Sequence, residues 1–281
     1  MDTNKLIKKI REEINKLHLA NQFLLGILVI IIAIAAIATI FVPGKKAYSI
    51  KSSQIQQVTP NQLSGQVRLA SGIERKVFIH YRQNVAARVR TKSRIASCSK
   101  IFGKDIKWKT LPIPYVVDPD NNNGLAEEFI TGVLMSSFGE WDFNTSASLL
   151  GARSVDYSAD FDTDAPDGRN ELLFGNYSDS NVIAITVIWG IFSGSPSQRK
   201  ISEFDILFDT DFTWGDATSD ASKMDLQNIA THELGHGLGI DDLYDSNCSE
   251  LTMYGYSLIG ETKKRTLENG DIKGVQKLYG E

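Results

Sequence analysis

This 281-residue chain has no excess of basic residues, no internal repeat and only four histidines. Its formal net charge is -4 and its isoelectric point is near 5.7, so it lacks the positive surface that a nucleic-acid partner requires. No segment repeats with a period of about 20 to 50 residues, which excludes solenoids and repeat arrays. The hydrophobic share of 42% excludes a disordered chain and is sufficient for one good core plus accessory segments.

The longest stretch without charge lies near the N-terminus, and its apolar part is residues 23–42. A helix rises about 1.5 Å per residue, so about 20 apolar residues cross a hydrocarbon core of about 30 Å. The stretch therefore predicts a single transmembrane helix. A cleaved signal peptide is the alternative, because residues 36–38 resemble a cleavage site. That triplet lies inside the apolar run, which favours an anchor.

Basic residues are concentrated before this stretch. Residues 1–22 contain five lysines and arginines, whereas residues 43–51 contain three lysines. The positive-inside rule then places the N-terminus in the cytoplasm and the rest of this single-pass chain outside the cell membrane. Apolar residues three and four apart between Ile7 and Leu24 form either an amphipathic segment or the seam of a weak coiled coil, through which the chain would self-associate.

The sequence beyond the apolar stretch divides near residue 104. Residues 43–103 are rich in Gln, Ser, Lys and Arg and contain one strand-like stretch, so we expect either a stalk or a small β segment with no chemistry of its own, in which His80 is a strand-surface residue and not a ligand. Residues 104–281 contain a strand pattern, a helical pattern, several short β-branched or aromatic runs, and two further helical patterns. This order predicts an α+β domain, with a twisted mixed sheet packed on helices.

The segment "ATHELGHGLGIDD", residues 230–242, places two of the four histidines one helical turn apart. Side chains four residues apart on a helix lie above one another, so His232 and His236 can bind the same metal ion. Glu233 lies next to the first histidine, where its carboxylate can accept a proton from an activated water molecule. A catalytic zinc ion takes three protein ligands and keeps one open position, so a third ligand is required.

The third ligand must come from beyond the end of this helix. On a continued helix, residue 242 would lie about 9 Å along the axis from His236, whereas a metal bond spans about 2 Å. The chain must therefore turn, and Gly237 and Gly239 allow it to, because glycine readily adopts the left-handed conformation that ends helices. The carboxylates that follow are Asp241, Asp242 and Asp245.

The string "HELGHGLGIDD" resembles the zinc signature of the metzincin metallopeptidases, in the variant with aspartate as third ligand, and this selects Asp242. "LTMY" supplies Met253 for the methionine turn that these enzymes have beneath the metal. "DIKGVQKLYG" is similar to the closing helix of the matrixin branch. The resemblance covers about residues 105–281. It implies a zincin-type fold and a zinc endopeptidase that cleaves a protein or peptide substrate, with Glu233 as general base.

The resemblance also suggests roles for other residues. Residues 181–190 would form an edge strand on which an extended substrate pairs, although the same residues suit a plain core strand. Tyr254 and Tyr256 follow Met253 and are candidates to stabilise the oxyanion, with a packing role as the alternative. Matrixins often carry structural calcium in the region of the acidic run at residues 160–167, and a solvated acidic turn is the alternative there.

The two cysteines, Cys98 and Cys248, both lie on the predicted outer side of the membrane, where disulfides persist. The sequence favours one bridge between them. The alternative is that Cys98 binds zinc in a latent form, as the propeptide cysteine of matrixins does. However, "ASCSKIFG" lacks the arginine and glycine that flank that cysteine in the family.

Together these features predict a membrane-anchored, extracytoplasmic zinc endopeptidase. The alternative is a catalytically silent surface receptor or adhesion module that binds zinc on the same scaffold. The presence of Glu233 favours the enzyme, because a silent module has no need of a general base beside the metal.

Overall fold

The computed structural model describes residues 56–63, 67–83 and 98–281, which belong to one compact unit, Ile55–Glu281. The predicted cytoplasmic segment at residues 1–22 and the predicted span at residues 23–42 lie outside the described residues. Within the described ranges, no helix combines the length and apolar character needed to cross a bilayer.

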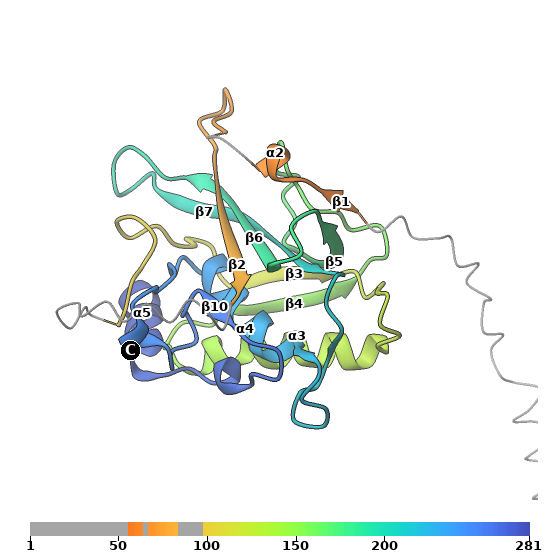
Figure 1. The fold of residues 1–281 in the computed structure, drawn as a ribbon. Coiled ribbons are helices and arrows are strands. Elements are labelled where there is room, and N and C mark those ends of the chain that lie inside the picture. Colours follow the sequence, from red (N-terminus) through yellow and green to blue (C-terminus); the bar gives the residue numbers. More distant parts are fainter. Residues whose placement is uncertain (1–55, 64–66, 84–97) are drawn as a thin grey trace, which may run out of the picture. The chain divides into compact units, whose positions relative to one another are not determined.

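A mixed β-sheet forms the centre of this unit (Figure 1), with strand order β10-β2-β6-β7-β5-β3-β4. β6 runs antiparallel to both of its neighbours, whereas β7, β5, β3 and β4 are mutually parallel. The strands are β2 (Glu74–Arg82), β3 (Ile113–Val117), β4 (Leu150–Val155), β5 (Glu171–Tyr177), β6 (Val182–Ile191), β7 (Lys200–Asp209) and β10 (Tyr256–Ser257). β1 (Gln57–Val58) pairs with β5, and β8 (Trp214–Gly215) pairs with β9 (Met224–Asp225).

Three helices of more than two turns accompany the sheet: α3 (Glu127–Phe143), α4 (Leu226–Gly237) and α5 (Asn269–Tyr279). α3 and α4 pack on each other beneath one face of the sheet (Figure 1). The shorter helical turns are α2 (Pro60–Leu63), η1 (Ser246–Cys248) and η2 (Lys263–Arg265). The twisted mixed sheet with few helices is the α+β architecture that the sequence predicts.

The apolar side chains form two clusters, one on each face of the sheet. The larger lies between the sheet and the helices and includes Phe138 and Trp141 of α3, which the 3.6-residue pattern predicts to face inward. The smaller lies on the opposite face and includes Val187 and Leu207. Both faces of the sheet are therefore covered. For this reason the central strands β6 and β7 are buried along nearly their whole length, and their sequences show little alternation of apolar and polar residues.

The placement of residues 74–82 corrects the sequence-based prediction of a stalk. These residues form β2, which pairs along almost its whole length with β6. The physical reason is that β2 is apolar on both faces: Phe78 packs into the larger cluster, and Val77 and Ile79 pack against the smaller one. A period-two pattern predicts a strand but does not indicate which sheet receives it. The same pairing shows that β6 is not an edge strand in this structure.

Candidate active site

Helix α4 carries the paired histidines and has a well-defined start. Asp225 is its N-cap, and the Asp225 carboxylate accepts a hydrogen bond from the backbone N–H of Asn228 at 2.8 Å. Arg265 holds the same carboxylate through an ion pair. The N-terminal end of the helix is therefore fixed on two sides, which fixes the position of the histidines about two and three turns further on.

The end of α4 returns the chain toward the histidines, as the glycines predict. The helix ends at Gly237, and Gly239 has a φ of +95°, in the left-handed region. The backbone N–H of Ile240 bonds to the carbonyl of Gly235 at 2.9 Å, which closes the turn. A side chain at position 239 would also lie 2.5 Å from the carbonyl oxygen of Ile106. Glycine is therefore required there both by conformation and by space.

This turn brings together three atoms that could bind one metal ion. The Nε2 atoms of His232 and His236 lie 3.1 Å apart, and Oδ1 of Asp242 lies 3.3 Å from the first and 3.5 Å from the second. Ligand atoms around a tetrahedral zinc ion with bonds of about 2.0 to 2.2 Å are separated by about 3.3 to 3.5 Å. The two nitrogen–oxygen distances lie within this range and the nitrogen–nitrogen distance lies slightly below it, so the three atoms can surround one such ion after a small adjustment.

The protonation of the two imidazoles also suits a metal. Nδ1 of His232 lies 2.7 Å from the carbonyl oxygen of Thr252, and Nδ1 of His236 lies 2.9 Å from that of Ile240. A carbonyl only accepts hydrogen bonds, so each Nδ1 carries a proton, and each Nε2 is the nitrogen that remains to bind a metal. Burial lowers the pKa of His232 to about 4, which keeps that imidazole neutral. Burial lowers the pKa of His236, but the Asp242 carboxylate outweighs burial and raises that pKa. Burial likewise opposes ionisation of Asp242, but the two imidazoles hold the pKa of Asp242 well below its usual range.

Glu233 is fully buried, and both of its carboxylate oxygens are engaged. Oε2 accepts a hydrogen bond from the hydroxyl of Thr186 on β6 at 2.6 Å, and Oε1 lies 3.0 Å from Nδ1 of His80 on β2. Burial raises the pKa of Glu233 to about 7. The carboxylate is thus held in one orientation beside the ligand cluster by strands that precede it in the sequence by 47 and 153 residues.

His80 differs from the sequence-based prediction of a strand-surface residue. It is 1% exposed, and its ring centroid lies 4.0 Å from that of His232. Nε2 of His80 also lies 3.1 Å from the hydroxyl of Ser257. The prediction was wrong because β2 lies over α4, so the polar side of the strand pattern faces the active-site helix instead of solvent. The signal available was that His80 is one of only four histidines.

Met253 lies against α4, as the resemblance implies. It is buried, and a Cβ atom added to Gly235 would collide with Sδ of Met253 and lie 2.7 Å from Cζ2 of Trp141. The carboxylate of Asp271 in α5 accepts hydrogen bonds from the backbone N–H groups of Thr252 at 2.9 Å and Met253 at 3.1 Å. The closing helix thus fixes the turn that supports the histidines.

Three tyrosines lie near the ligands, and the sequence singled out only two of them. Tyr254 and Tyr256 pack together with ring centroids 5.7 Å apart. The tyrosine that reaches a ligand is Tyr244, whose hydroxyl donates to Oδ2 of Asp242 at 3.0 Å. Tyr244 lies two residues beyond the signature, where no spacing rule points to it.

Lys264 is a further residue that sequence reasoning missed. Its ammonium group is buried, donates to the carbonyl oxygens of Tyr254 and Tyr256, and lies 3.4 Å from Nε2 of His80. Burial lowers the pKa of Lys264 to about 8. In the sequence it is the middle residue of "KKR", a run that normally indicates a solvated surface.

The remaining predicted candidates lie elsewhere. Asp241 pairs with Lys100 at 2.8 Å, and the carboxylate of Asp245 accepts from the backbone of Asn247, so neither carboxylate joins the histidines. Cys98 and Cys248 are joined in a disulfide, in agreement with the pairing that the sequence favoured. The Cys98 sulfur is therefore not a free thiol that could act as a metal ligand.

In the acidic loop, Asp162 and Asp167 meet Glu203 of β7, with one oxygen from each residue within 4.8 Å of the others. Glu203 is buried, and its Oε1 makes no hydrogen bond within the described part of the chain. The three oxygens and the buried carboxylate suit a calcium ion. Sequence reasoning found the two aspartates, but Glu203 lies in a strand outside the acidic run.

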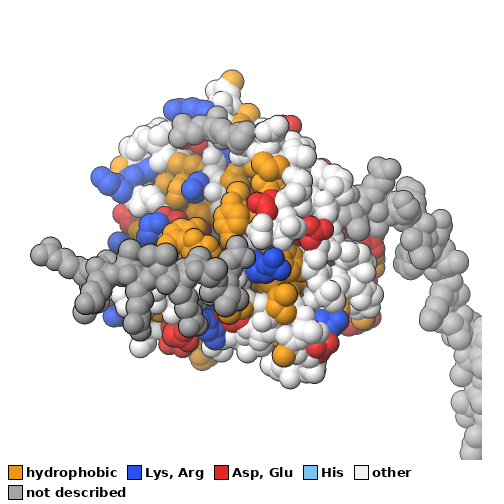
Figure 2. Space-filling view, in the orientation of Figure 1, with side chains coloured by type: hydrophobic (Ala, Val, Ile, Leu, Met, Phe, Trp, Pro, Cys, Tyr) orange, Lys and Arg blue, Asp and Glu red, His pale blue; other side chains and the backbone are white. Residues whose placement is uncertain are grey.

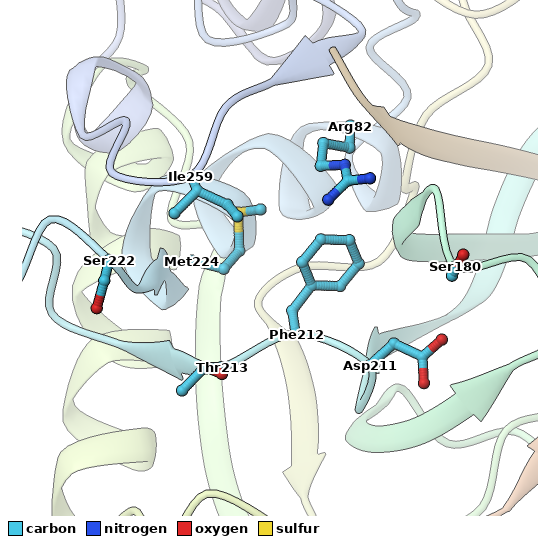
Figure 3. Close-up of a pocket in the computed structure, with 8 residues that line it drawn as sticks. All are labelled: Arg82, Ser180, Asp211, Phe212, Thr213, Ser222, Met224 and Ile259. Atoms are coloured by element: carbon cyan, nitrogen blue, oxygen red, sulfur yellow. The ribbon is translucent and has the colours of Figure 1, made fainter. Parts of the chain in front are cut away.

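The ligand cluster is closed to solvent. His80, His232 and His236 are at most 1% exposed, and no histidine side chain is visible on the face shown in Figure 2. A separate pocket opens where β2 ends, with Arg82 beside Phe212, Met224 and Ile259 (Figure 3).

Comparison with known proteins agrees with this geometry. Residues 107–280 match the model of the matrixin family. The chain is 41% identical to human matrilysin over 76 residues, which cover 27% of each chain. It is 31% identical over 160 residues to the hatching enzyme of Paracentrotus lividus, covering 57% of this chain and 23% of the relative. It is 30% identical over 188 residues to metalloendoproteinase 2-MMP of Arabidopsis thaliana, covering 64% of this chain and 44% of the relative.

The chain therefore spans less than half the length of these relatives. The matched family region contains α4, Asp242, the methionine turn and the closing helix, and it makes up more than half of the chain. The chain belongs to the matrixin family.

Proposed function

We propose that this chain is a zinc-dependent endopeptidase in which Glu233 is the general base. The observation that carries the proposal is the meeting of His232 Nε2, His236 Nε2 and Asp242 Oδ1 at nearly tetrahedral spacing, with a buried carboxylate beside them. Family membership supports the same chemistry, because the signature that the chain shares is that of metal-dependent peptidases.

Zinc, when bound by these three side chains, supplies a Lewis acid that polarises both water and the scissile carbonyl. Glu233 accepts a proton from the attacking water and later delivers it to the leaving amine. A pKa of about 7 suits both transfers near neutral pH. Thr186 keeps the carboxylate in position, and Tyr244 keeps Asp242 in position, by the hydrogen bonds described above.

The substrate of this activity is an extended peptide that pairs with β6. Strand addition supplies main-chain hydrogen bonds with little dependence on side chains, which suits an endopeptidase that acts on unfolded segments. The apolar stretch at residues 23–42 supports anchoring in the cell membrane with the catalytic domain outside, and the disulfide agrees with an oxidising compartment. Sedimentation with membranes after alkaline washing, lost on deletion of residues 1–42, tests the anchor.

The activity is tested by comparing the zinc-loaded chain with Glu233→Gln, which preserves the size and shape of the side chain but cannot act as a base. We expect the substitution to lower hydrolysis of an unfolded, fluorescently labelled protein by at least about 100-fold at unchanged zinc content. Equal, residual hydrolysis by both forms would instead support the silent zinc-binding module.

A further inference from the structure

β2 precedes the region that matches the family, yet it lies directly over the candidate active site. The family match begins at residue 107, whereas β2 comprises Glu74–Arg82. It is antiparallel to β6 from the pair Glu74 and Gly190 to the pair Tyr81 and Val182. Its last residues pair in parallel with β10, Tyr81 with Tyr256 and Arg82 with Ser257. β2 therefore lies between β6 and β10 and pairs through its backbone with both strands, as an extended bound peptide would.

The inward-facing side chains of β2 cover the ligand cluster. The ring of Phe78 stacks on that of His236, with centroids 4.0 Å apart and an interplanar angle of 7°. His80 lies against His232 and contacts Oε1 of Glu233, the carboxylate that must receive a proton from water. With β2 in place, Glu233 is fully buried and each of its carboxylate oxygens already has a hydrogen-bond partner. A scissile peptide bond cannot reach Glu233 while β2 occupies this position.

Removal of β2 would leave a free strand edge beside the candidate active site, to which an extended peptide substrate could bind. β6 would become an edge strand with unpaired N–H and C=O groups, which an extended peptide can satisfy. The parallel ladder of β10 would offer the same peptide a second set of partners. The resemblance implies that β6 is an edge strand, but in this structure it is not. The edge of β6 that would be free for a substrate is the edge with which β2 pairs.

We propose that β2 is an internal strand that fills the substrate groove and holds the peptidase closed, so that substrates bind only after β2 is displaced. This inference rests on the proposed function. The closed form is held by backbone pairing, by the contacts of His80 with Glu233 and Ser257, and by Val77 and Ile79 on the opposite face. Cys98 does not provide the latency, because its sulfur is bonded to Cys248.

The test uses an engineered disulfide that locks β2 to β6 on the face of the sheet opposite the candidate active site. Val77 of β2 is paired directly with Val187 of β6, and directly paired residues lie close enough for a disulfide. In the full zinc-loaded chain, V77C/V187C should bind trialanine hydroxamate, a minimal extended zinc ligand, only after reduction. The wild-type chain and the two single-cysteine variants, treated with the same reductant, control for reduction of the native bridge.

His80→Ala provides the opposite perturbation. Loss of its hydrogen bonds should raise the population of displaced β2 and tighten hydroxamate binding by about tenfold. Hydrogen exchange gives a readout that is independent of turnover. Backbone amides of β2 should exchange faster in wild type when the hydroxamate is added, and faster in His80→Ala even without it.

The outcomes separate the inference from the proposed function. Equal hydroxamate binding by the oxidised and reduced cysteine pair, or protection of the β2 amides that is unchanged by the ligand, would overturn the inference. If the hydroxamate displaces β2 but the unlocked variants cleave no more substrate than Glu233→Gln, the inference stands and the peptidase assignment fails.

Discussion

Gly235 lies between His232 and His236 on α4, at a point where a side chain would disturb the packing of Met253 and Trp141 against the helix. An added Cβ would press on Met253 and lie 2.7 Å from the rigid ring of Trp141. We expect Gly235→Ala to lower the free energy of unfolding by about 1 to 3 kcal/mol, although alanine is the better helix former. Urea unfolding followed by circular dichroism measures this difference.

Gly139 of α3 provides the matched control, because nothing lies within 4 Å of a Cβ atom added there. Gly139→Ala should raise the free energy of unfolding by about 0.5 to 1 kcal/mol. If Gly235→Ala proved equally stabilising, Met253 would not be packed as described. The contrast between the two glycines thus tests the methionine turn without any assay of activity.

At the residue scale, the sequence indicated the residues that share one helical turn or follow a family signature. His232, Glu233, His236 and Asp242 are of this kind. Thr186, Tyr244 and Lys264 are not, because each reaches the site through contacts between elements that no local spacing encodes. A polar residue in an otherwise ordinary strand or loop gives no signal until the strands are assembled.

At the scale of single elements, β5 and β7 bring carboxylates into buried positions. Burial raises the pKa of Glu203 to about 8 and that of Glu171 to about 7. Carboxyl groups with a raised pKa in the folded state stabilise the fold when protonated, and this contribution is lost as pH rises through the folded-state values. The calcium-free chain should therefore lose stability between about pH 4.5 and pH 8 because of these groups.

A calcium ion at Asp162, Asp167 and Glu203 would offset this loss, because it neutralises the ionised carboxylates. We expect calcium to raise the melting temperature more at pH 8 than at pH 5. Glu203→Gln should reduce both the pH dependence and the calcium effect. A calcium effect that persisted unchanged in Glu203→Gln would place the ion elsewhere.

The elements themselves followed from the sequence more readily than their arrangement did. α3, α4 and α5 were predicted because their apolar residues recur at helical spacing, and α4 was predicted to end where Gly239 turns the chain. β2 was recognised as a strand but not as part of the main sheet. Its partner β6 lies about 100 residues further along the chain, and the pattern of a strand contains no information about a distant partner.

At the scale of the whole molecule, the described residues form one unit from Ile55 onward instead of a stalk followed by a domain at residue 104. β2 and the disulfide both tie the earlier residues to the metal-site region, since Cys248 lies in the loop that follows Asp242. This arrangement allows the residues before the family region to control access to the groove.

The central claim is that one zinc ion is held by two histidines and Asp242. Zinc titration of the chain, of Asp242→Ala and of Asp241→Ala tests it most directly, because Asp241 is an adjacent carboxylate that pairs with Lys100 instead. We expect wild type and Asp241→Ala to bind zinc equally, and Asp242→Ala to bind it at least about tenfold more weakly. Equal zinc affinity in the two aspartate variants would contradict it.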